Sequence, residues 1–338
     1  MRNFILCMVC LLVVAGARAQ QRPHYTQYVL NQYIINPAIT GIENYTDVKF
    51  SHRHQWVGFE DAPVTTYFTI HKALGKNDYR TTATSFEMEG ENPRGKGYWS
   101  EYEPADPHHG IGLQVINDQT GPINNFSAYA TYAYHIGISP RTNLAAGFGA
   151  GISKIGLNAS KLDFYNTTVD PAVYQSGIIN KIRPDLSAGL YLYSSDYFLG
   201  ISAQQIIPQK IDYSNNAITS DQNKLIPHLF ATAGYRFLAG ENFNVTPSVM
   251  VKHINHLPTQ VDFNTKVQYR DIAWIGGGYR LKDGFTGLVG LNISNRINLS
   301  YSYDYTTSGL NNYSKGTHEV LIGFILGNTF ESCPRNVW

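Results

Sequence analysis

The chain has 338 residues, and its 26 Lys and Arg residues are balanced by 25 Asp and Glu residues, which leaves a formal net charge of +1. A chain this close to neutral lacks the basic surface of nucleic-acid-binding proteins, so we expect no nucleic-acid partner. Charged residues make up only 15% of the chain, whereas Tyr and Gly number 24 and 30. This composition is typical of a transmembrane β-barrel, in which apolar and polar residues alternate along each strand.

The first residues of the chain have the pattern of a secretory signal. A short basic start is followed by the apolar stretch 4–16 and then by Ala-Arg-Ala, a cleavage site of the small-x-small type. We therefore expect a signal peptide over 1–19 and a mature N-terminus at Gln20. The apolar stretch is short for a membrane span. Two of the three cysteines leave with the signal, so the mature chain keeps Cys333 alone and can form no intrachain disulfide.

The segment 20–45, before the first expected strand, is rich in Tyr, Asn and Gln. Its core, "HYTQYVLNQYIINPAITG" at 24–41, contains no Asp, Glu, Lys or Arg. Amides and tyrosines are costly when bare in lipid, so this segment is expected to fill the polar lumen of the barrel as a plug. The alternative is a strap along the periplasmic rim. The candidate contact residues in the segment are Tyr25, Gln27, Tyr28, Asn31, Gln32, Asn36 and Pro37.

The next motif, "HRHQWVGFED" at 52–61, begins in the last three residues of the first expected strand and continues beyond it. Its polar and aromatic side chains, Arg53, Gln55, Trp56 and Asp61, are expected to form a network that holds the plug to the barrel wall. Contact with a partner protein is the second possibility for these four residues.

The rest of the chain alternates in twos, the period of a β-strand. In "LSYSYDYT" at 299–306, for example, Tyr301, Tyr303 and Tyr305 share one face, and Ser302 and Asp304 share the other. We expect the tyrosines to face lipid, since a lipid-facing Asp is costly. A soluble β-sandwich would alternate in the same way, but many segments here run for about ten residues, the length of a tilted membrane strand.

The predicted fold is all-β: a transmembrane antiparallel barrel of about 14 strands over 46–327, with a tail at 328–338. Short turns alternate with longer loops, as in outer-membrane barrels. The short turns are expected at 137–141, 194–196, 239–242, near 270 and at 294–295, and the longer loops at 157–184, 207–227, 255–260 and 307–316. The strands are expected near 46–54, 64–73, 109–117, 125–136, 142–156, 185–193, 197–206, 228–238, 243–254, 261–269, 271–281, 285–293, 296–306 and 317–327.

One connection departs from this pattern. The linker 75–108 should lie on the side of the short turns, yet it is the longest there and mixes five Glu residues with Tyr and Trp. Such a loop is either a docking element for a partner or a tolerated insertion.

Catalytic and metal-binding motifs are weak. The histidine pairs His52/His54, His108/His109 and His253/His256 have no Cys or carboxylate at ligand spacing, so we expect lumen or rim histidines rather than a metal site. No Ser–His pair can be singled out. The glycine clusters at 147–151 and 276–278 lie within strand patterns, where they are expected to relieve crowding on the inner face. We expect no enzyme activity and no cofactor.

The quoted motifs also resemble a known family, PorP/SprF, the outer-membrane barrels of Bacteroidota associated with type IX secretion and gliding. The resemblance covers essentially the whole mature chain, apart from the longer, more acidic 75–108. It implies an outer-membrane protein that assists the export or surface attachment of a secreted surface protein, in contact with other type IX secretion components and outer-membrane lipid. No small-molecule substrate is expected. A diffusion porin is the alternative. The resemblance rests on the segment at 24–41, on "SHRHQWVGFEDAPVTTYFTIHKAL" at 51–74, and on five further stretches: "GIGLQVINDQTGPINNFSAYATYAYHI" at 110–136, "LAAGFGAGISKIGLN" at 144–158, "HLFATAGYRF" at 228–237, "THEVLIGF" at 317–324 and "CPRNVW" at 333–338.

Overall fold

The structure is a computed structural model of the whole chain. The predicted signal peptide 1–19, most of the linker 75–108 and the tail 328–338 lie outside the residues that it describes, so these predictions stay untested. The structure describes residues 25–76, 102–158, 161, 178–207, 226–240, 242–255, 257–270, 272–294, 296–307 and 314–327.

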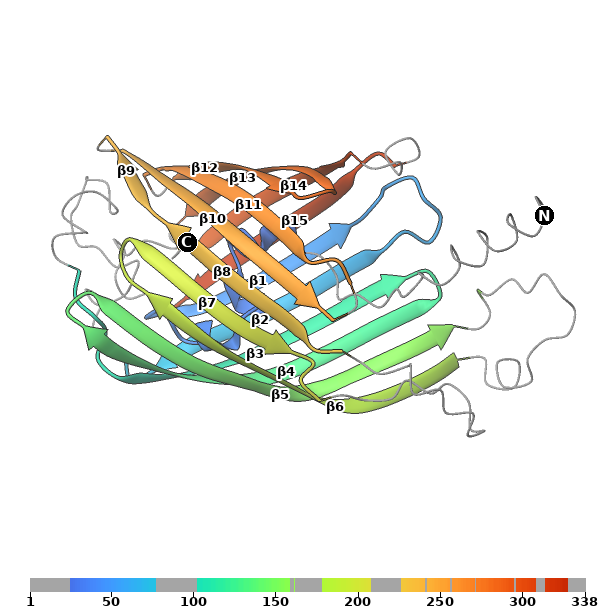
Figure 1. Cartoon of the computed structure of the whole chain (residues 1–338), viewed down its shortest axis with the longest axis horizontal. Coiled ribbons are helices and arrows are strands. Elements are labelled where there is room, and N and C mark those ends of the chain that lie inside the picture. Colours follow the sequence, from blue (N-terminus) through green and yellow to red (C-terminus); the bar gives the residue numbers. More distant parts are fainter. Residues whose placement is uncertain are drawn as a thin grey trace, which may run out of the picture.

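The described residues form a wall of antiparallel strands (Figure 1). Their side chains alternate between the two faces of the wall, as the sequence pattern requires. The strands are β1 (Thr46–His54), β2 (Val64–Leu74), β3 (His108–Thr120), β4 (Ile123–Ser139), β5 (Thr142–Asn158), β6 (Ile178–Tyr193), β7 (Tyr197–Gln204), β8 (His228–Tyr235), β9 (Phe237–Ala239), β10 (Phe243–Ile254), β11 (Gln260–Tyr269), β12 (Ala273–Arg280), β13 (Gly284–Ser294), β14 (Ile297–Thr306) and β15 (Thr317–Leu326).

The wall is a closed barrel. β1 pairs with both β2 and β15, and β11 pairs with both β10 and β12, so the described sheet has no break around the ring. β8 and β9 both pair with β10 and are separated only by Arg236. Across from this interruption lies Pro247 of β10, which has no N–H to donate to the ladder. The two pieces act as one wall strand, which confirms the prediction of 14 strands.

Two predicted connections are wrong in length. β6 begins at Ile178, seven residues before the predicted start, because it pairs with the long β5 as far as Asn158. Pro184 lies inside this strand and hides it from a sequence reading. β3 and β4 are joined by only two residues, Gly121 and Pro122, where a longer linker was expected.

The barrel has two ends, which we name by β1. The near end is where β1 begins at Thr46, and the far end is where β1 finishes at His54. Because the strands alternate in direction, all the short turns predicted for one side do lie at the near end, together with the linker between β2 and β3. The far end carries the long loops, but also a two-residue linker at 121–122 that was not expected. A further short linker there, at 281–283, agrees with the three residues left between the expected strands 271–281 and 285–293.

The outer face of the barrel is apolar and carries aromatic residues near both ends. Tyr301 and Tyr305 are exposed, whereas Ser302 and Asp304 are 1% and 6% exposed, which confirms the predicted phase of β14. Phe243 and Tyr269 form a ring pair at the near end, and Tyr279 pairs with Phe285 at the far end. Aromatic girdles at both membrane interfaces are a feature of transmembrane barrels.

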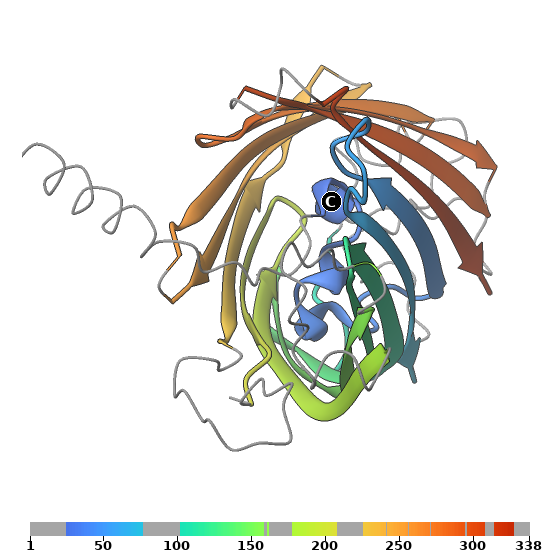
Figure 2. The same cartoon turned by 90° about the vertical axis from the view of Figure 1, so that its right-hand side faces the viewer.

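Three short 3-10 helices precede β1: η1 (Thr26–Val29), η2 (Gln32–Ile34) and η3 (Pro37–Ile39). Figure 2, which looks toward one end of the barrel, shows them in blue inside the ring of strands. In the described part of the chain, no helix is long and apolar enough to cross a membrane.

Candidate functional site in the barrel lumen

The candidate site is the lumen, where the N-terminal segment 25–45 packs against the inner face of the wall. Every residue from Tyr25 to Glu43 is buried. The third turn begins as its sequence predicts, because the Asn36 side chain accepts a hydrogen bond from the Ala38 N–H and Pro37 occupies the first helical position.

The segment runs along the lumen from the far end to the near end. Thr26 binds Asp304, which lies near the far end of β14. The Thr40 carbonyl oxygen is 2.8 Å from Nε2 of His135, which lies near the near end of β4. Between these points the segment passes the middle of β3, since Gln114 contacts Tyr33. The chain therefore traverses most of the lumen before it turns into β1.

In the middle of the lumen, the wall recognises the main chain of the segment. Gln114 donates from Nε2 to the Tyr33 carbonyl oxygen at 2.6 Å. On the other side, the Ile35 carbonyl oxygen accepts from Ser202 Oγ at 2.6 Å and from Gln204 Nε2 at 3.1 Å. These donors are neutral side chains of β3 and β7. They hold carbonyl groups that a short 3-10 turn leaves without a full set of partners.

The near end continues this main-chain recognition with basic side chains. Lys76 donates from Nζ to the Ile42 carbonyl oxygen at 2.9 Å. His135 lies against the Thr40 carbonyl oxygen, and its ring stacks on that of His108 with centroids 4.6 Å apart. The carbonyl groups on both sides of Gly41 are thereby held to the wall.

Glycines in the wall allow this close approach. A Cβ atom at Gly147 of β5 would lie 2.5 Å from the Pro37 carbonyl oxygen, and one at Gly189 of β6 would lie 2.1 Å from the Asn36 side-chain oxygen. Both distances are too short for any side chain. The structure thus agrees with the expectation that glycine relieves crowding on the inner face, and shows that it makes room for the segment.

The side chains of the segment also bind the wall. Asn31 donates from Nδ2 to the Thr69 hydroxyl at 3.0 Å, and Asn36 donates from Nδ2 to the Leu190 carbonyl oxygen at 3.0 Å. Gln32 accepts from the Tyr191 hydroxyl at 3.2 Å. The amide-rich composition that singled out this segment is therefore used for hydrogen bonds across the lumen.

The tyrosines of the segment are buried as well. Tyr25 packs edge-to-face on Tyr67 of β2, with ring centroids 5.5 Å apart. The Tyr28 hydroxyl accepts from Asn264 Nδ2 at 2.5 Å, and that of Tyr33 lies 2.5 Å from the Thr131 hydroxyl. The hydroxyls of Tyr28 and Tyr33 therefore both have a polar partner in the wall.

Charged residues dominate the far end of the lumen. Arg53 of β1, which is 2% exposed, forms ion pairs with Asp304 at 2.7 Å and Glu319 at 3.1 Å. The Thr26 hydroxyl joins them, accepting from Arg53 Nη1 at 2.8 Å and donating to Asp304 Oδ2 at 2.7 Å. Such a cluster is stable in a buried site only while each charge keeps its partners.

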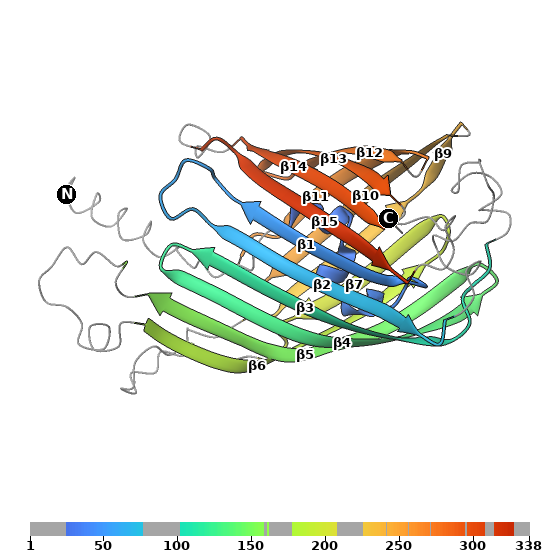
Figure 3. The same cartoon turned by 180° about the vertical axis from the view of Figure 1, so that it is seen from behind.

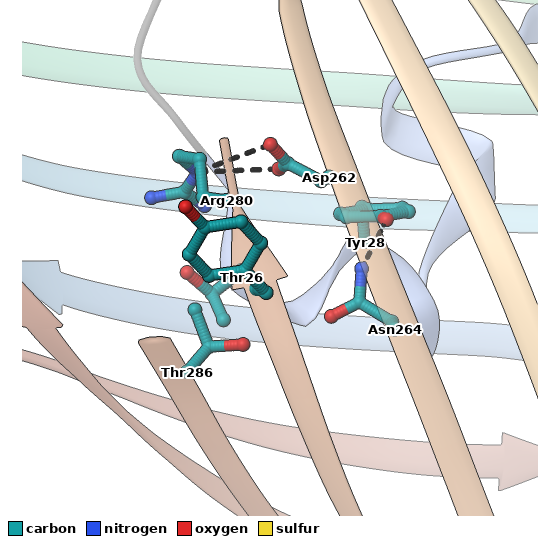
Figure 4. A pocket seen from close by; sticks show the side chains of 7 residues that line it. Thr26, Tyr28, Asp262, Asn264, Arg280 and Thr286 are labelled. Carbon is teal, nitrogen blue, oxygen red and sulfur yellow. Dashed lines mark hydrogen bonds and ion pairs between the residues drawn. The ribbon is translucent and has the colours of Figure 1, made fainter. Parts of the chain in front are cut away.

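A second ion pair lies beside this cluster. Arg280 Nε of β12 is 3.2 Å from Asp262 Oδ2 of β11, and Arg280 Nη1 is 3.7 Å from Asp304. Figure 4 shows this pair facing the first turn of the segment, next to the hydrogen bond between Tyr28 and Asn264. A small hollow at this place is lined by Thr26, Tyr28, Asp262, Asn264, Tyr279, Arg280 and Thr286.

The motif at 52–61 divides between two places. With its amide oxygen turned toward the guanidinium, Gln55 accepts from Arg53 Nε at 3.2 Å and joins the far-end cluster. Trp56 and Asp61 do not join it. The main-chain N–H of Trp56 donates to the Thr317 hydroxyl, and the Asp61 carboxylate forms an ion pair with Lys161 among the far-end linkers. The expectation that all four residues hold the segment is therefore wrong for these two, because both lie in the linker beyond β1.

Glu319 is absent from the predicted set, yet it is fully buried at the centre of the far-end cluster. Its carboxylate accepts from the main-chain N–H groups of Thr26 and Gln27 at 3.0 and 3.3 Å. Gln27 also accepts from the Ser300 hydroxyl at 3.2 Å. An acidic residue at an inward-facing position of the last strand was the available signal, but its partners are distant in sequence.

The histidines are distributed over both faces of the wall. His52 and His109 face outward, where their Nδ1 atoms lie 2.9 Å from the Thr66 hydroxyl and 2.6 Å from the Tyr132 hydroxyl. His135 faces the lumen. Within the residues that the structure describes, no group of three or more His, Cys, Asp or Glu side chains could hold a metal ion.

Comparison with known proteins gives a family. The model of the family described as "Type IX secretion system membrane protein PorP/SprF" matches residues 17–324. A search of curated proteins found no match.

Among solved structures, the toluene transporter TbuX of Ralstonia pickettii is 10% identical, with 87% of this chain and 92% of that chain covered and a TM-score of 0.49. The CymD monoaromatic hydrocarbon channel is 9% identical, with coverages of 89% and 92% and a TM-score of 0.48. The toluene transporter TodX of Pseudomonas putida is 10% identical, with coverages of 92% and 94% and a TM-score of 0.45. At these TM-scores the similarities carry no functional argument.

The family match covers most of the chain, including the segment in the lumen and nearly all of the wall. Closed transmembrane β-barrels of this kind reside in the outer membrane. The chain belongs to the PorP/SprF family and is a membrane β-barrel of the type IX secretion system.

Proposed function

We propose that this barrel assists the export or the surface attachment of a secreted partner protein, after a cleaved signal peptide has directed it across the inner membrane. Membership in a family of secretion-system membrane proteins supports an accessory role in protein export. On this view the barrel works together with other components of the type IX machinery and serves a surface protein.

The observation that carries the proposal is that the N-terminal segment is bound along the lumen. A diffusion porin needs a water-filled path between its inward-facing polar residues. Several of those residues are bound to the segment instead: Gln114 and Ser202 donate hydrogen bonds to its carbonyl groups, and Arg53 donates one to the Thr26 hydroxyl. A lumen occupied in this way favours a protein-handling barrel over a channel for small solutes.

A diffusion porin or small-solute channel is the competing function, and conductance separates the two. The purified full-length protein should show little steady current in a planar lipid bilayer. A steady current from the full-length protein, at the level of an open barrel, would contradict the proposal and favour the porin.

The partner is sought by purification from the native outer membrane. The barrel should copurify with components of the secretion machinery and with a secreted surface protein, identified by mass spectrometry and compared with an unrelated outer-membrane barrel from the same cells. Recovery of neither class above that control would contradict the proposed role.

The long linker at the near end is a candidate docking element of this function. With the near end in the periplasm, a Ser100→Cys variant in a Cys333→Ser background should resist an impermeant thiol reagent in intact cells and react once the outer membrane is opened. Lys282→Cys, in a far-end turn, is the matched control and should react in intact cells. Labelling of Ser100→Cys in intact cells would place the linker outside.

A further inference from the structure

The ring of strands closes where β1 pairs with β15, the first strand with the last (Figure 3). The register of this joint places Arg53 directly opposite Glu319. Both side chains point into the lumen and are buried. The joint therefore carries a charged pair on its inner face, at the level where the N-terminal segment begins its path through the lumen.

Glu319 of β15 is bound both by β1 and by the first turn of the segment. Its Oε1 accepts from the Ser51 hydroxyl of β1 at 3.0 Å, and its Oε2 accepts from Arg53 Nη1 at 3.1 Å. The same Oε2 accepts from the main-chain N–H groups of Thr26 and Gln27. One carboxylate of the last strand thus joins the first strand and the first turn of the segment.

This arrangement specifies the register of closure. A slip of β15 by one residue would turn Glu319 toward lipid, because successive side chains face opposite sides. A slip by two residues would place Thr317 or Leu321 opposite Arg53. The guanidinium and the Glu319 carboxylate would then be buried without each other, which is strongly unfavourable.

The path of the segment adds a constraint on the order of events. The segment is continuous with β1 at the near end, and Thr26 reaches the cluster at the far end. Once β1 and β15 have paired, the segment is enclosed by the wall on all sides. Entry after closure would require a chain bearing buried tyrosines and amides to thread along a lumen whose polar groups lack partners.

We propose that η1 docks on Glu319 before the ring closes, and that this docking promotes the pairing of β1 with β15 in the correct register. The N-terminal segment is then a template for closing the barrel in addition to an occupant of its lumen. The proposal concerns assembly and does not depend on the role of the barrel in secretion.

The test is refolding in detergent micelles, followed by electrophoresis in dodecyl sulfate without heating, which separates closed barrels from open chains. A chain lacking 24–41 should give a closed fraction several-fold lower than the full-length chain. A synthetic peptide of residues 24–45, added during refolding, should restore the yield. Closure of the deleted chain to the same yield as the full-length chain would overturn the proposal.

If the peptide fails to restore closure, point variants test whether docking of η1 on Glu319 promotes it. Glu319→Gln should lower the closed fraction several-fold, whereas Gln204→Ala, which loosens the same segment at β7 away from the seam, should leave it unchanged. Equal losses from the two variants would overturn the proposal. Because Glu319 also pairs with Arg53 and Ser51 of β1, Glu319→Gln should still lower closure in the chain that lacks 24–41, but by a smaller factor than in the full-length chain. An equal factor in both chains would also overturn the proposal.

Discussion

At the far end of the lumen, carboxylates of the wall accept hydrogen bonds from N–H and hydroxyl groups of Thr26 and Gln27. In the middle and at the near end, side chains of the barrel instead donate hydrogen bonds to carbonyl groups of the segment. The far-end contacts are charged and converge on Arg53 and Glu319. In the middle of the lumen, neutral side chains and glycines of the wall contact the main chain of the segment. The first region depends on particular side chains in the segment and wall, and the second on the shape of the main chain.

This difference predicts how each region responds to change. A charged cluster fails when one member is lost, because the remaining charges stay buried without partners. A region that binds the main chain is expected to tolerate substitutions in the segment but not added bulk in the wall, since a Cβ in the wall meets backbone that has no room to move.

The largest expected effect is at the far end. Arg53→Met should destabilise the barrel by about 3–5 kcal/mol, because Asp304 and Glu319 lose their shared cation while they remain buried. Denaturant unfolding of the detergent-solubilised barrel measures the loss. Arg296→Met, in an exposed near-end turn, is the control and should change stability little. Similar losses from both variants would show that the far-end cluster is not a special region.

The next effect tests the middle region. Gly147→Ala places a Cβ against the Pro37 carbonyl oxygen and should cost about 1–3 kcal/mol as the segment is pushed off β5. Gly287→Ala on the outer face of β13 is the matched control, because nothing lies within 4 Å of its added Cβ. Faster proteolysis of the segment in Gly147→Ala, but not in Gly287→Ala, would show that the middle region has no room for added bulk in the wall. Equal stability and equal proteolysis of the two variants would contradict this.

The smallest effect comes from single donors in the wall. Ser202 and Gln204 share the Ile35 carbonyl oxygen, so the loss of either alone should cost roughly 0.5–1.5 kcal/mol. The double variant Ser202→Ala/Gln204→Ala should cost more than the sum, because the buried carbonyl then loses both donors. Unfolding of the four proteins in a double-mutant cycle measures the coupling. Strict additivity would mean that the carbonyl finds another partner.

The fold was largely predictable because alternation is a local property of each strand. The period of two in "LSYSYDYT" gives the phase of β14, and the structure confirms it. The start of β6 was missed, because Pro184 and the surrounding charges mask a strand whose extent is set by the length of β5. Strand ends depend on the partner strand, which the local sequence does not contain.

The candidate site was predictable in its segment but not in its wall. The absence of charge from 24–41 points to a polar, enclosed setting, and the described part of the segment is buried. Glu319, by contrast, lies 266 positions from Arg53 in the sequence, and only the closure of the ring brings the two together. Trp56 and Asp61 were misassigned because β1 ends at His54, so residues beyond it no longer lie on the lumen face beside Arg53, although they are close to it in sequence.

We infer that the N-terminal segment closes the lumen to solutes. Single-channel recording in planar bilayers tests it most directly, with the full-length protein compared with the variant lacking 24–41 and each current taken per closed barrel inserted. We expect little steady conductance for the full-length barrel and a clear open-channel conductance for the barrel that lacks 24–41. A deleted barrel that folds and conducts no more than the full-length protein would contradict it.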